Sequence, residues 1–231
     1  MEAICCGLDF PAGISLDPAG GKMYWADQNT RKIQRANLDG SHVEDVVTDL
    51  NLPYYIKLDL DRHHIYWTDH GSDKIQRANF DGTELVDLVT TGLELPRGLA
   101  LDTERNKMYW ADRGTDRLQR ADLDGTNVET IYEAPIGGAD PAPHGVALDI
   151  INEQLYWVDN GLQKILRADL DGSNVFEVLT AADGLLDRPW EIILDTRSVP
   201  EAGLPPILCY LWGLYFFARY RTARIHSGLT Q

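Results

Sequence analysis

The residues with the most chemical potential in this sequence are an aspartate and an arginine that recur together at a fixed distance. The aspartate ends a Tyr-Trp-x-Asp motif, and seven residues separate it from the arginine in every copy. Four carboxylates and four guanidinium groups repeated in this way could line a ring that binds a charged ligand. The pairs are Asp27 and Arg35, Asp69 and Arg77, Asp112 and Arg120, and Asp159 and Arg167.

A structural role explains these residues better than a binding ring does. A residue that every copy of a repeat needs is needed by the fold, and ion pairs between strands fix register while they satisfy backbone groups. Function in a repeat protein usually lies where the copies differ. We therefore interpret the recurring Asp and Arg as structural, together with the tryptophan of each motif, whose bulk fills the space between repeats. These tryptophans are Trp25, Trp67, Trp110 and Trp157.

Little in the sequence indicates catalysis or metal binding. His63 and His64 follow an acidic turn, but no Cys or carboxylate lies at a ligand spacing beyond Asp59 and Asp61. There is no Ser-His-Asp motif in a recognisable context and no nucleotide-binding glycine loop. We therefore predict no catalytic residue, no metal site and no cofactor.

The recurring residues belong to a repeat of 42 to 47 residues. An Asp-Gly-Ser/Thr turn follows each Tyr-Trp-x-Asp motif, and a segment that begins with proline and ends in Leu-Asp precedes it. That segment occurs a fifth time as PWEIILD, at residues 189–195, so the chain holds four full copies and the opening of a fifth. The motif itself stands at residues 24–27, 66–69, 109–112 and 156–159.

Each copy has the pattern of four short strands. In KMYWAD, at residues 22–27, successive side chains point to opposite faces and both sets are largely apolar, so both faces must be covered. Asp-Gly supplies the tight hairpin before the fourth strand. Such four-stranded antiparallel units are typical of the blades of a β-propeller. We predict an all-β propeller domain over residues 1–195 and a divergent hydrophobic and basic tail over residues 196–231.

The succession of motifs resembles the class B, or YWTD, repeat of the low-density lipoprotein receptor family. The likeness rests on Pro-x-Gly-Ile-x-Leu-Asp, Tyr-Trp-x-Asp and Lys-Ile-x-Arg-Ala-x-Leu-Asp-Gly, in register through about residues 2–195. The resemblance implies a propeller, normally six-bladed, that acts as a non-enzymatic module binding a protein or peptide. In receptors such propellers are often flanked by epidermal-growth-factor-like modules, so the resemblance also implies an extracellular or membrane-receptor setting.

Residues that differ between copies are the candidates for partner binding. They lie in the loops that enter each first strand and in the turns between second and third strands, which meet around the central channel on one face of a propeller. Tyr, Trp, Arg and His together are typical of protein-binding surfaces. Neutral variation in exposed loops explains the same differences almost as well. The candidates are Tyr54, Tyr55, His70, Arg97, Arg113, His144 and Trp190.

An enzyme is the alternative function. Some six-bladed propellers are calcium-dependent lactonases that use acidic and amide groups around the channel mouth. Nothing in the spacing of the comparable residues here gives that alternative further support. Those residues are Asn51, Glu94, Asp140 and Asp187.

Charge and cysteine content bear on partners and compartment. The net charge is −15, and residues 196–231 carry four arginines against one acid, a balance of +3 that leaves −18 for residues 1–195. This field repels nucleic acid and favours basic partners or cations. Three cysteines, two of them adjacent, make no disulfide framework, and the chain as written shows neither a signal peptide nor an Asn-x-Ser/Thr sequon. These features favour an intracellular compartment, in contrast to the resemblance.

The repeat pattern stops at Asp195, and three interpretations of the remainder are open. We favour a chain whose end is not the natural one, because pattern and charge change abruptly. Alternatively, the tail (ILCYLW, LYFFARY) supplies irregular strands that residues 2–6 close into a five-bladed ring. A third reading is a membrane segment at residues 204–218, although a spanning helix needs about 20 apolar residues. An open ring would expose apolar blade faces, so we expect self-association in that case.

Overall fold

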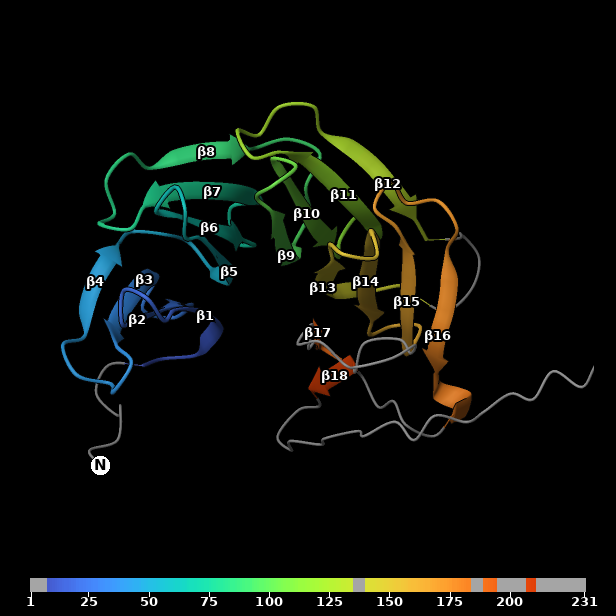
Figure 1. Cartoon of the computed structure of the whole chain (residues 1–231), viewed down its shortest axis with the longest axis horizontal. Helices are drawn as coiled ribbons and strands as arrows, with labels where there is room; N and C mark the ends of the chain where they lie inside the picture. Colours follow the sequence, from blue (N-terminus) through green and yellow to red (C-terminus); the bar gives the residue numbers. More distant parts are fainter. Residues whose placement is uncertain (1–7, 135–139, 184–188, 195–206, 211–231) are drawn as a thin grey trace, which may run out of the picture.

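The computed structural model describes residues 8–134, 140–183, 189–194 and 207–210. Within these ranges the chain forms β-strands, with one short 3-10 helix at Ala181–Asp183. The strands gather into antiparallel sheets in chain order. Figure 1 shows the sheets following one another round an arc, and in each four-stranded sheet the first strand is innermost and the fourth strand outermost. The all-β propeller architecture predicted from the repeat is confirmed.

Four sheets have four strands each, and we call them blades 1 to 4. Blade 1 consists of β1 (Pro11–Asp17), β2 (Lys22–Asp27), β3 (Lys32–Asn37) and β4 (Glu44–Val47). Blade 2 consists of β5 (Pro53–Asp59), β6 (His64–Asp69), β7 (Lys74–Asn79) and β8 (Val86–Val89). Blade 3 consists of β9 (Pro96–Asp102), β10 (Lys107–Asp112), β11 (Arg117–Asp122) and β12 (Glu129–Glu133). Blade 4 consists of β13 (Pro143–Asp149), β14 (Gln154–Asp159), β15 (Lys164–Asp169) and β16 (Phe176–Thr180).

A fifth sheet begins the next sector of the arc. Its first strand, β17 (Glu191–Leu194), packs beside β13 and pairs with β18 (Ile207–Tyr210). The tail therefore contributes a second strand within the segment ILCYLW. A strand at residues 2–6 and most of the uncharged segment 204–218 lie outside the described residues. In the part of the chain that the structure describes, no helix has the length and hydropathy to cross a membrane.

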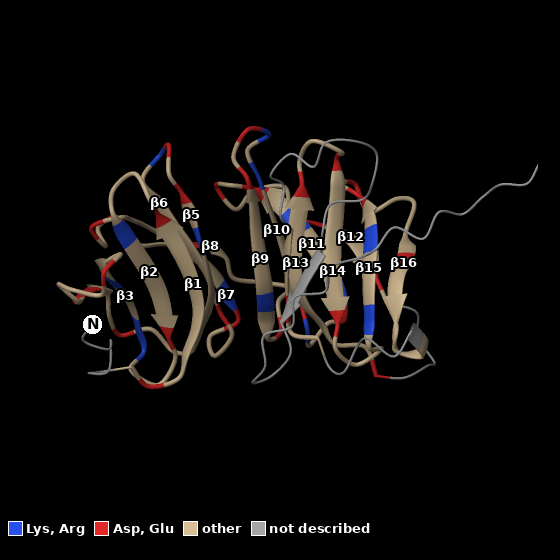
Figure 2. Cartoon of the chain, turned by 60° about the horizontal axis from the view of Figure 1, so that its bottom comes forward, with Lys and Arg blue, Asp and Glu red and all other residues tan. Residues whose placement is uncertain are grey.

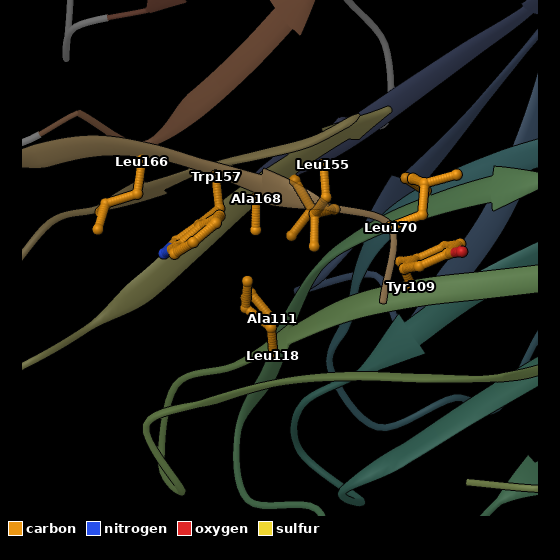
Figure 3. Packing of buried hydrophobic residues seen from close by; sticks show 10 residues of the cluster. Tyr109, Ala111, Leu118, Leu155, Trp157, Leu166, Ala168 and Leu170 are labelled. Atoms are coloured by element: carbon orange, nitrogen blue, oxygen red, sulfur yellow. The ribbon is translucent and has the colours of Figure 1, made fainter. Parts of the chain in front are cut away.

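The hydrophobic core lies between the blades. The Tyr of each second strand points toward the following blade and the Trp toward the preceding one, as the alternation along a strand requires. Figure 3 shows one such interface, where Ala111 and Leu118 of blade 3 face Trp157 and Ala168 of blade 4. Burying a Trp removes roughly 150–250 Å² from water, which stabilises the interface by roughly 4 kcal/mol or more.

The aspartate of each motif binds backbone N–H groups. In blade 2 the Asp69 carboxylate accepts hydrogen bonds from the N–H groups of Asn51 and Leu52, at 2.9 and 3.1 Å, in the loop that enters the blade. It also accepts from Gly71 and Ser72, at 3.1 and 3.0 Å, in the turn after the motif. Each equivalent carboxylate makes at least one bond of each kind, so it ties the entering loop to the turn. The equivalents are Asp27, Asp112 and Asp159.

The arginine of each repeat lies eight residues after the aspartate, on the third strand, and has other partners. Arg35 Nε bonds Glu44 Oε1 on the fourth strand at 2.6 Å, and its Nη1 donates to the Phe80 carbonyl of the next blade at 2.8 Å. Arg120 repeats this arrangement with Glu129 and the Leu170 carbonyl.

Asp and Arg therefore act separately, and the charge pairs considered from their spacing are not formed in the described blades. The two other arginines face apolar residues on the fourth strand. Arg77 lies opposite Val86, and Arg167 stacks on Phe176 with 5.3 Å between Cζ and the ring centroid.

In blades 2 to 4 the glycine of the Asp-Gly turn does more than allow a tight hairpin. Gly82 has φ +82°, and a Cβ there would lie 1.9 Å from the Val46 carbonyl oxygen of blade 1. Gly125 and Gly172 approach the preceding blade equally closely. The turn therefore docks directly on the backbone of the neighbouring blade, which only glycine permits.

One face of blade 1 differs from the corresponding face of the other blades. Its tryptophan, Trp25, forms a small cluster with Met23 and Ala36 alone, whereas each other motif tryptophan packs against a preceding blade. Within the described residues no sheet lies against this face, and Figure 1 shows the arc open between blade 1 and the fifth sheet.

Candidate partner-binding site at the channel mouth

The seven residues proposed for partner binding gather at one end of the arc. Each first strand begins with proline opposite the Asp that ends the second strand, as Pro53 lies opposite Asp69. The entering loops and the turns after the motif therefore share this end, which we call the channel mouth.

Tyr54 is the centre of one half of the cluster. Its ring lies 5.1 Å from the His70 ring and 5.2 Å from the Tyr55 ring, measured between centroids. The guanidinium carbon of Arg97, from blade 3, lies over the Tyr54 ring at 4.3 Å. This stack fixes the Arg97 guanidinium on an aromatic platform.

Trp190 joins the other half of the cluster across the channel. His144 of blade 4 packs edge-on against the Trp190 ring at 4.5 Å, and its Nδ1 donates to the Trp190 carbonyl at 2.7 Å. The Tyr55 hydroxyl of blade 2 donates to the same carbonyl at 3.1 Å. Since a carbonyl only accepts, Nδ1 carries the ring proton. Three sectors of the arc thus meet at one oxygen atom.

Burial divides the seven candidates. His144 is 1% exposed and Tyr55 is 8% exposed, so both support the site from below. The half-buried side chains are Tyr54, His70, Arg97 and Trp190, and Arg113 is exposed. A partner at the channel mouth can therefore contact these five, whereas the sequence alone had placed all seven on the surface.

The two histidines of the cluster are neutral at pH 7. Burial lowers the pKa of His144 to about 3, and the nearby Arg97 charge acts in the same direction. Burial and then Arg97 lower the pKa of His70 to about 4. Neutral His144 leaves a lone pair on Nε2, a buried atom without a hydrogen-bond partner in the structure.

Two arginines lie at the channel mouth, beside acidic residues of the same loops and turns. Arg97 and Arg113 supply positive charge here, although burial lowers the pKa of Arg97. Figure 2 shows acidic residues in the loops at both ends of the strands. Arg97 and Arg113 are therefore basic groups among aromatic side chains, with Asp73, Glu94 and Asp116 in the same loops and turns.

Sequence reasoning missed Lys57, which lies on β5 inside the channel. Burial lowers the pKa of Lys57, and the Glu191 carboxylate on β17 opposes that shift. Burial raises the pKa of Glu191, and Lys57 opposes it. The lysine between two apolar residues in PYYIKLD was the available signal.

The residues considered for an enzyme are not assembled into a site in the described chain. Asn51 Nδ2 donates to the Gly71 carbonyl at 2.6 Å, so its amide belongs to the turn of its own blade. Glu94 and Asp140 are exposed, and Asp187 lies outside the described residues. Among the described residues, no group of three His, Cys, Asp or Glu side chains is arranged to hold a metal ion.

Comparison with known families gives a match to low-density lipoprotein receptor repeat class B. The family profile matches residues 21–59, 63–103 and 153–196, which together make up more than half of the chain. The matched ranges cover the second to fourth strands of blades 1, 2 and 4 and the first strands of blades 2 and 3 and of the fifth sheet.

Relatives and solved structures agree with this match. Low-density lipoprotein receptor-related protein 4 of Homo sapiens is 54% identical over 35 residues, which is 15% of this chain and 2% of that protein. The Mus musculus protein of the same name is 51% identical over the same length, so the chain spans only about 2% of these curated relatives.

Two structural neighbours were compared. A crystal structure of a nidogen/laminin complex superposes with a TM-score of 0.75 at 27% identity, covering 87% of this chain and 72% of that chain. Virginiamycin B lyase from Staphylococcus aureus gives a TM-score of 0.64 at 19% identity, over 79% of this chain and 59% of that chain, and shares the fold alone.

Proposed function

Because the chain belongs to the family of low-density lipoprotein receptor class B repeats, we propose that it is a non-enzymatic module that binds a protein or peptide at the channel mouth. Propellers of this family typically act as protein-interaction modules. The similar solved structure is described as a complex of nidogen and laminin, which also favours a protein partner.

One observation carries the proposal: aromatic and basic side chains from three separate blades and the fifth sheet converge at one end of the arc. Tyr54, Arg97 and Trp190 are half-buried, so each keeps part of its surface available while its neighbours hold it in place. Rigid Tyr, Trp and Arg side chains of this kind dominate the binding energy of protein interfaces.

The two guanidinium groups of the site favour a partner that brings an acidic group. Arg97 lies on the Tyr54 ring, and Arg113 adds a second guanidinium that is exposed. A guanidinium binds a carboxylate through two parallel hydrogen bonds, which gives orientation as well as affinity.

Selection of peptides from a random display library on the immobilised full chain tests the proposal. The dissociation constant of a selected peptide is then measured by titration calorimetry against the parent chain, Tyr54→Ala and Arg113→Ala. We expect each variant to bind at least about tenfold more weakly, because a central aromatic or arginine contact contributes more than about 1.4 kcal/mol.

Arg105→Ala is the matched control, since Arg105 lies in blade 3 like Arg113 but in the turn between β9 and β10, at the opposite end. It should bind like the parent chain. Peptides whose affinity depends on Arg105 and ignores Tyr54 and Arg113 would place the interaction elsewhere and reject the proposal.

A second assay addresses catalysis. We expect no hydrolysis of simple lactones by the folded chain with or without added calcium, because the described residues assemble neither a metal site nor the acid and amide groups considered for it. Calcium-dependent turnover that disappears in Asn51→Ala or Glu94→Ala would contradict the non-enzymatic assignment.

A further inference from the structure

One lysine lies inside the channel, away from the ion pairs of the blade surfaces. Four of the six lysines bind a carboxylate, and Lys22 donates to the Asn37 amide oxygen at 2.7 Å. Lys57 forms no ion pair with a described residue, and it is half-buried, so part of its side chain is accessible. The paired lysines are Lys32, Lys74, Lys107 and Lys164.

The side of β5 that carries Lys57 faces the fifth sheet. Tyr55 lies two residues earlier, so its side chain leaves the strand on the same side. The Tyr55 hydroxyl reaches the Trp190 carbonyl across the channel, and Glu191 is the next residue of the fifth sheet. Glu191 is the charged group that acts on Lys57, and Lys57 is the charged group that acts on Glu191. An amine and a carboxyl group therefore face each other across the channel, and in the described structure they do not form an ion pair.

Short side chains occupy the position of Lys57 in the other blades. The first strands line the inside of the arc (Figure 1), and alignment of their sequences places blade 2 apart from blades 1, 3 and 4. The residues equivalent to Lys57 are Ser15, Ala100 and Ala147. Among these four blades, blade 2 alone presents an amine at this level of the channel.

Burial prepares both groups for reaction with a carbonyl compound. It lowers the pKa of Lys57, which increases the fraction of free amine near neutral pH, and the free amine is the nucleophile. It raises the pKa of Glu191, which increases the fraction of carboxylic acid that can donate a proton. The charge of each group opposes the shift of the other.

We propose that Lys57 is a covalent binding site for small aldehydes, which it holds as an imine with Glu191 as the proton donor. The Lys57 amine attacks the carbonyl carbon, a C–N bond forms, and a proton moves from nitrogen to oxygen, which gives a carbinolamine. Glu191 then protonates the hydroxyl group, the C–O bond breaks, and water leaves as the nitrogen electron pair forms the C=N bond. The remaining N–H proton returns to the Glu191 carboxylate, so amine and aldehyde give imine and water.

The Lys57 site lies in the channel below the side chains proposed to bind a partner, and the inference does not depend on the proposed function. Trapping with acetaldehyde tests it in the full chain. Sodium borohydride added at successive times reduces the imine to an ethylamine, and peptide mass spectrometry gives the modified fraction at each lysine. We expect Lys57 to react at least about threefold faster than Lys22 at pH 7.

Lys22 is the internal reference, because it is also half-buried and bonds an amide instead of a carboxylate. In urea the rates at Lys57 and Lys22 should become equal, since the unfolded chain gives both amines the same surroundings. A Lys57 that reacts no faster than Lys22 in the folded chain overturns the proposal. A ratio of the two rates that urea leaves unchanged also overturns it.

Glu191→Gln tests the proton donor. If Glu191 acted only through its charge, its loss would let the pKa of Lys57 fall further, and the additional free amine would speed the reaction. Loss of a proton donor has the opposite effect, so we expect Lys57 to react at least about threefold more slowly while the rate at Lys22 stays the same. An unchanged or faster reaction at Lys57, in a variant that circular dichroism shows folded, overturns the assignment of Glu191. If the variant does not fold, the comparison of Lys57 with Lys22 in the parent chain decides the proposal.

Discussion

At the scale of single residues, the aspartate of the Tyr-Trp-x-Asp motif holds two backbone segments together through hydrogen bonds. The Asp69 carboxylate is 1% exposed and accepts four N–H groups from two segments that are otherwise separate. A charged acceptor suits this position, because hydrogen bonds to charged groups are stronger than those between neutral groups.

We predict that Asp69→Asn lowers the free energy of unfolding by about 2–3 kcal/mol, because the amide is a neutral acceptor and turns an NH2 group toward N–H donors. Urea unfolding followed by circular dichroism measures the loss. Asp61→Asn, at an exposed aspartate of the same blade, serves as control and should change the midpoint little. Equal midpoints for the two variants would show that the Asp69 contacts contribute nothing.

His144 makes the free energy of unfolding depend on pH. Its pKa is lowered to about 3 in the folded state, against an ordinary value of 6.5, so below pH 6.5 the unfolded chain takes up a proton that the folded chain does not. Stability is therefore lost as pH falls from 6.5 toward 3, at up to about 1.4 kcal/mol per pH unit. Replacing His144 with asparagine keeps a donor for the Trp190 carbonyl and removes the titrating ring.

We predict that the fall in unfolding free energy between pH 7 and pH 5 is smaller by about 2 kcal/mol in His144→Asn than in the parent chain. Urea titrations at the two pH values measure both quantities. His42→Asn changes an exposed histidine and should retain the pH dependence of the parent. Identical pH dependence in His144→Asn and the parent would mean that His144 is not neutral in the folded state.

At the scale of strands and turns, the Asp-Gly hairpin connects one blade to the next. Its sequence predicts a tight turn, and the structure has one. The residue types of a turn do not indicate which segment packs against it, however. In the structure Gly82 lies against the Val46 carbonyl of blade 1. The need for glycine is therefore steric as well as conformational.

We predict that Gly82→Ala lowers the free energy of unfolding by more than Gly92→Ala does. Both glycines have positive φ, +82° and +74°, so both variants bear a conformational cost of about 1 kcal/mol. Only Gly82 has backbone in the way of a Cβ, whereas Gly92 has nothing within 4 Å. Urea midpoints compare the two, and equal losses would mean that the turn does not dock on blade 1.

Features of the fold could be predicted from the sequence where their signals lie within one repeat. The period, the Tyr-Trp alternation and the turn residues are local, so the four strands of each blade could be predicted from them. The partners of Arg35, Tyr55 and His144 lie 45 to 135 residues away, in other blades, and no spacing within one repeat encodes them. For the same reason the convergence of the site could be predicted from the loops, but the burial of Tyr55 and His144 could not.

At the scale of the whole molecule, the arc is unevenly protected. Blades 2 and 3 are covered on both faces, while blade 1 and the fifth sheet each border the opening. In a structure built from stacked units, a unit with one neighbour opens more readily than a unit with two.

We predict that the amides of β1 exchange with deuterium faster than those of β5 and β9 in dilute solution. The three strands have the same place in their blades, but Ile14 is 60% exposed where Leu99 is fully buried. Hydrogen exchange read by mass spectrometry compares the three peptides directly. Protection of β1 equal to that of β9 at low protein concentration would contradict this gradient.

The Trp190 carbonyl oxygen joins opposite sides of the arc through hydrogen bonds. It accepts Tyr55 from one side of the channel and His144 from another, so any widening of the arc must break a bond at the very place where a partner is proposed to bind. The curvature of the arc and the affinity for a partner are then thermodynamically linked. A partner that binds at the channel mouth opposes widening of the arc, and widening of the arc lowers the affinity for that partner by the same free energy.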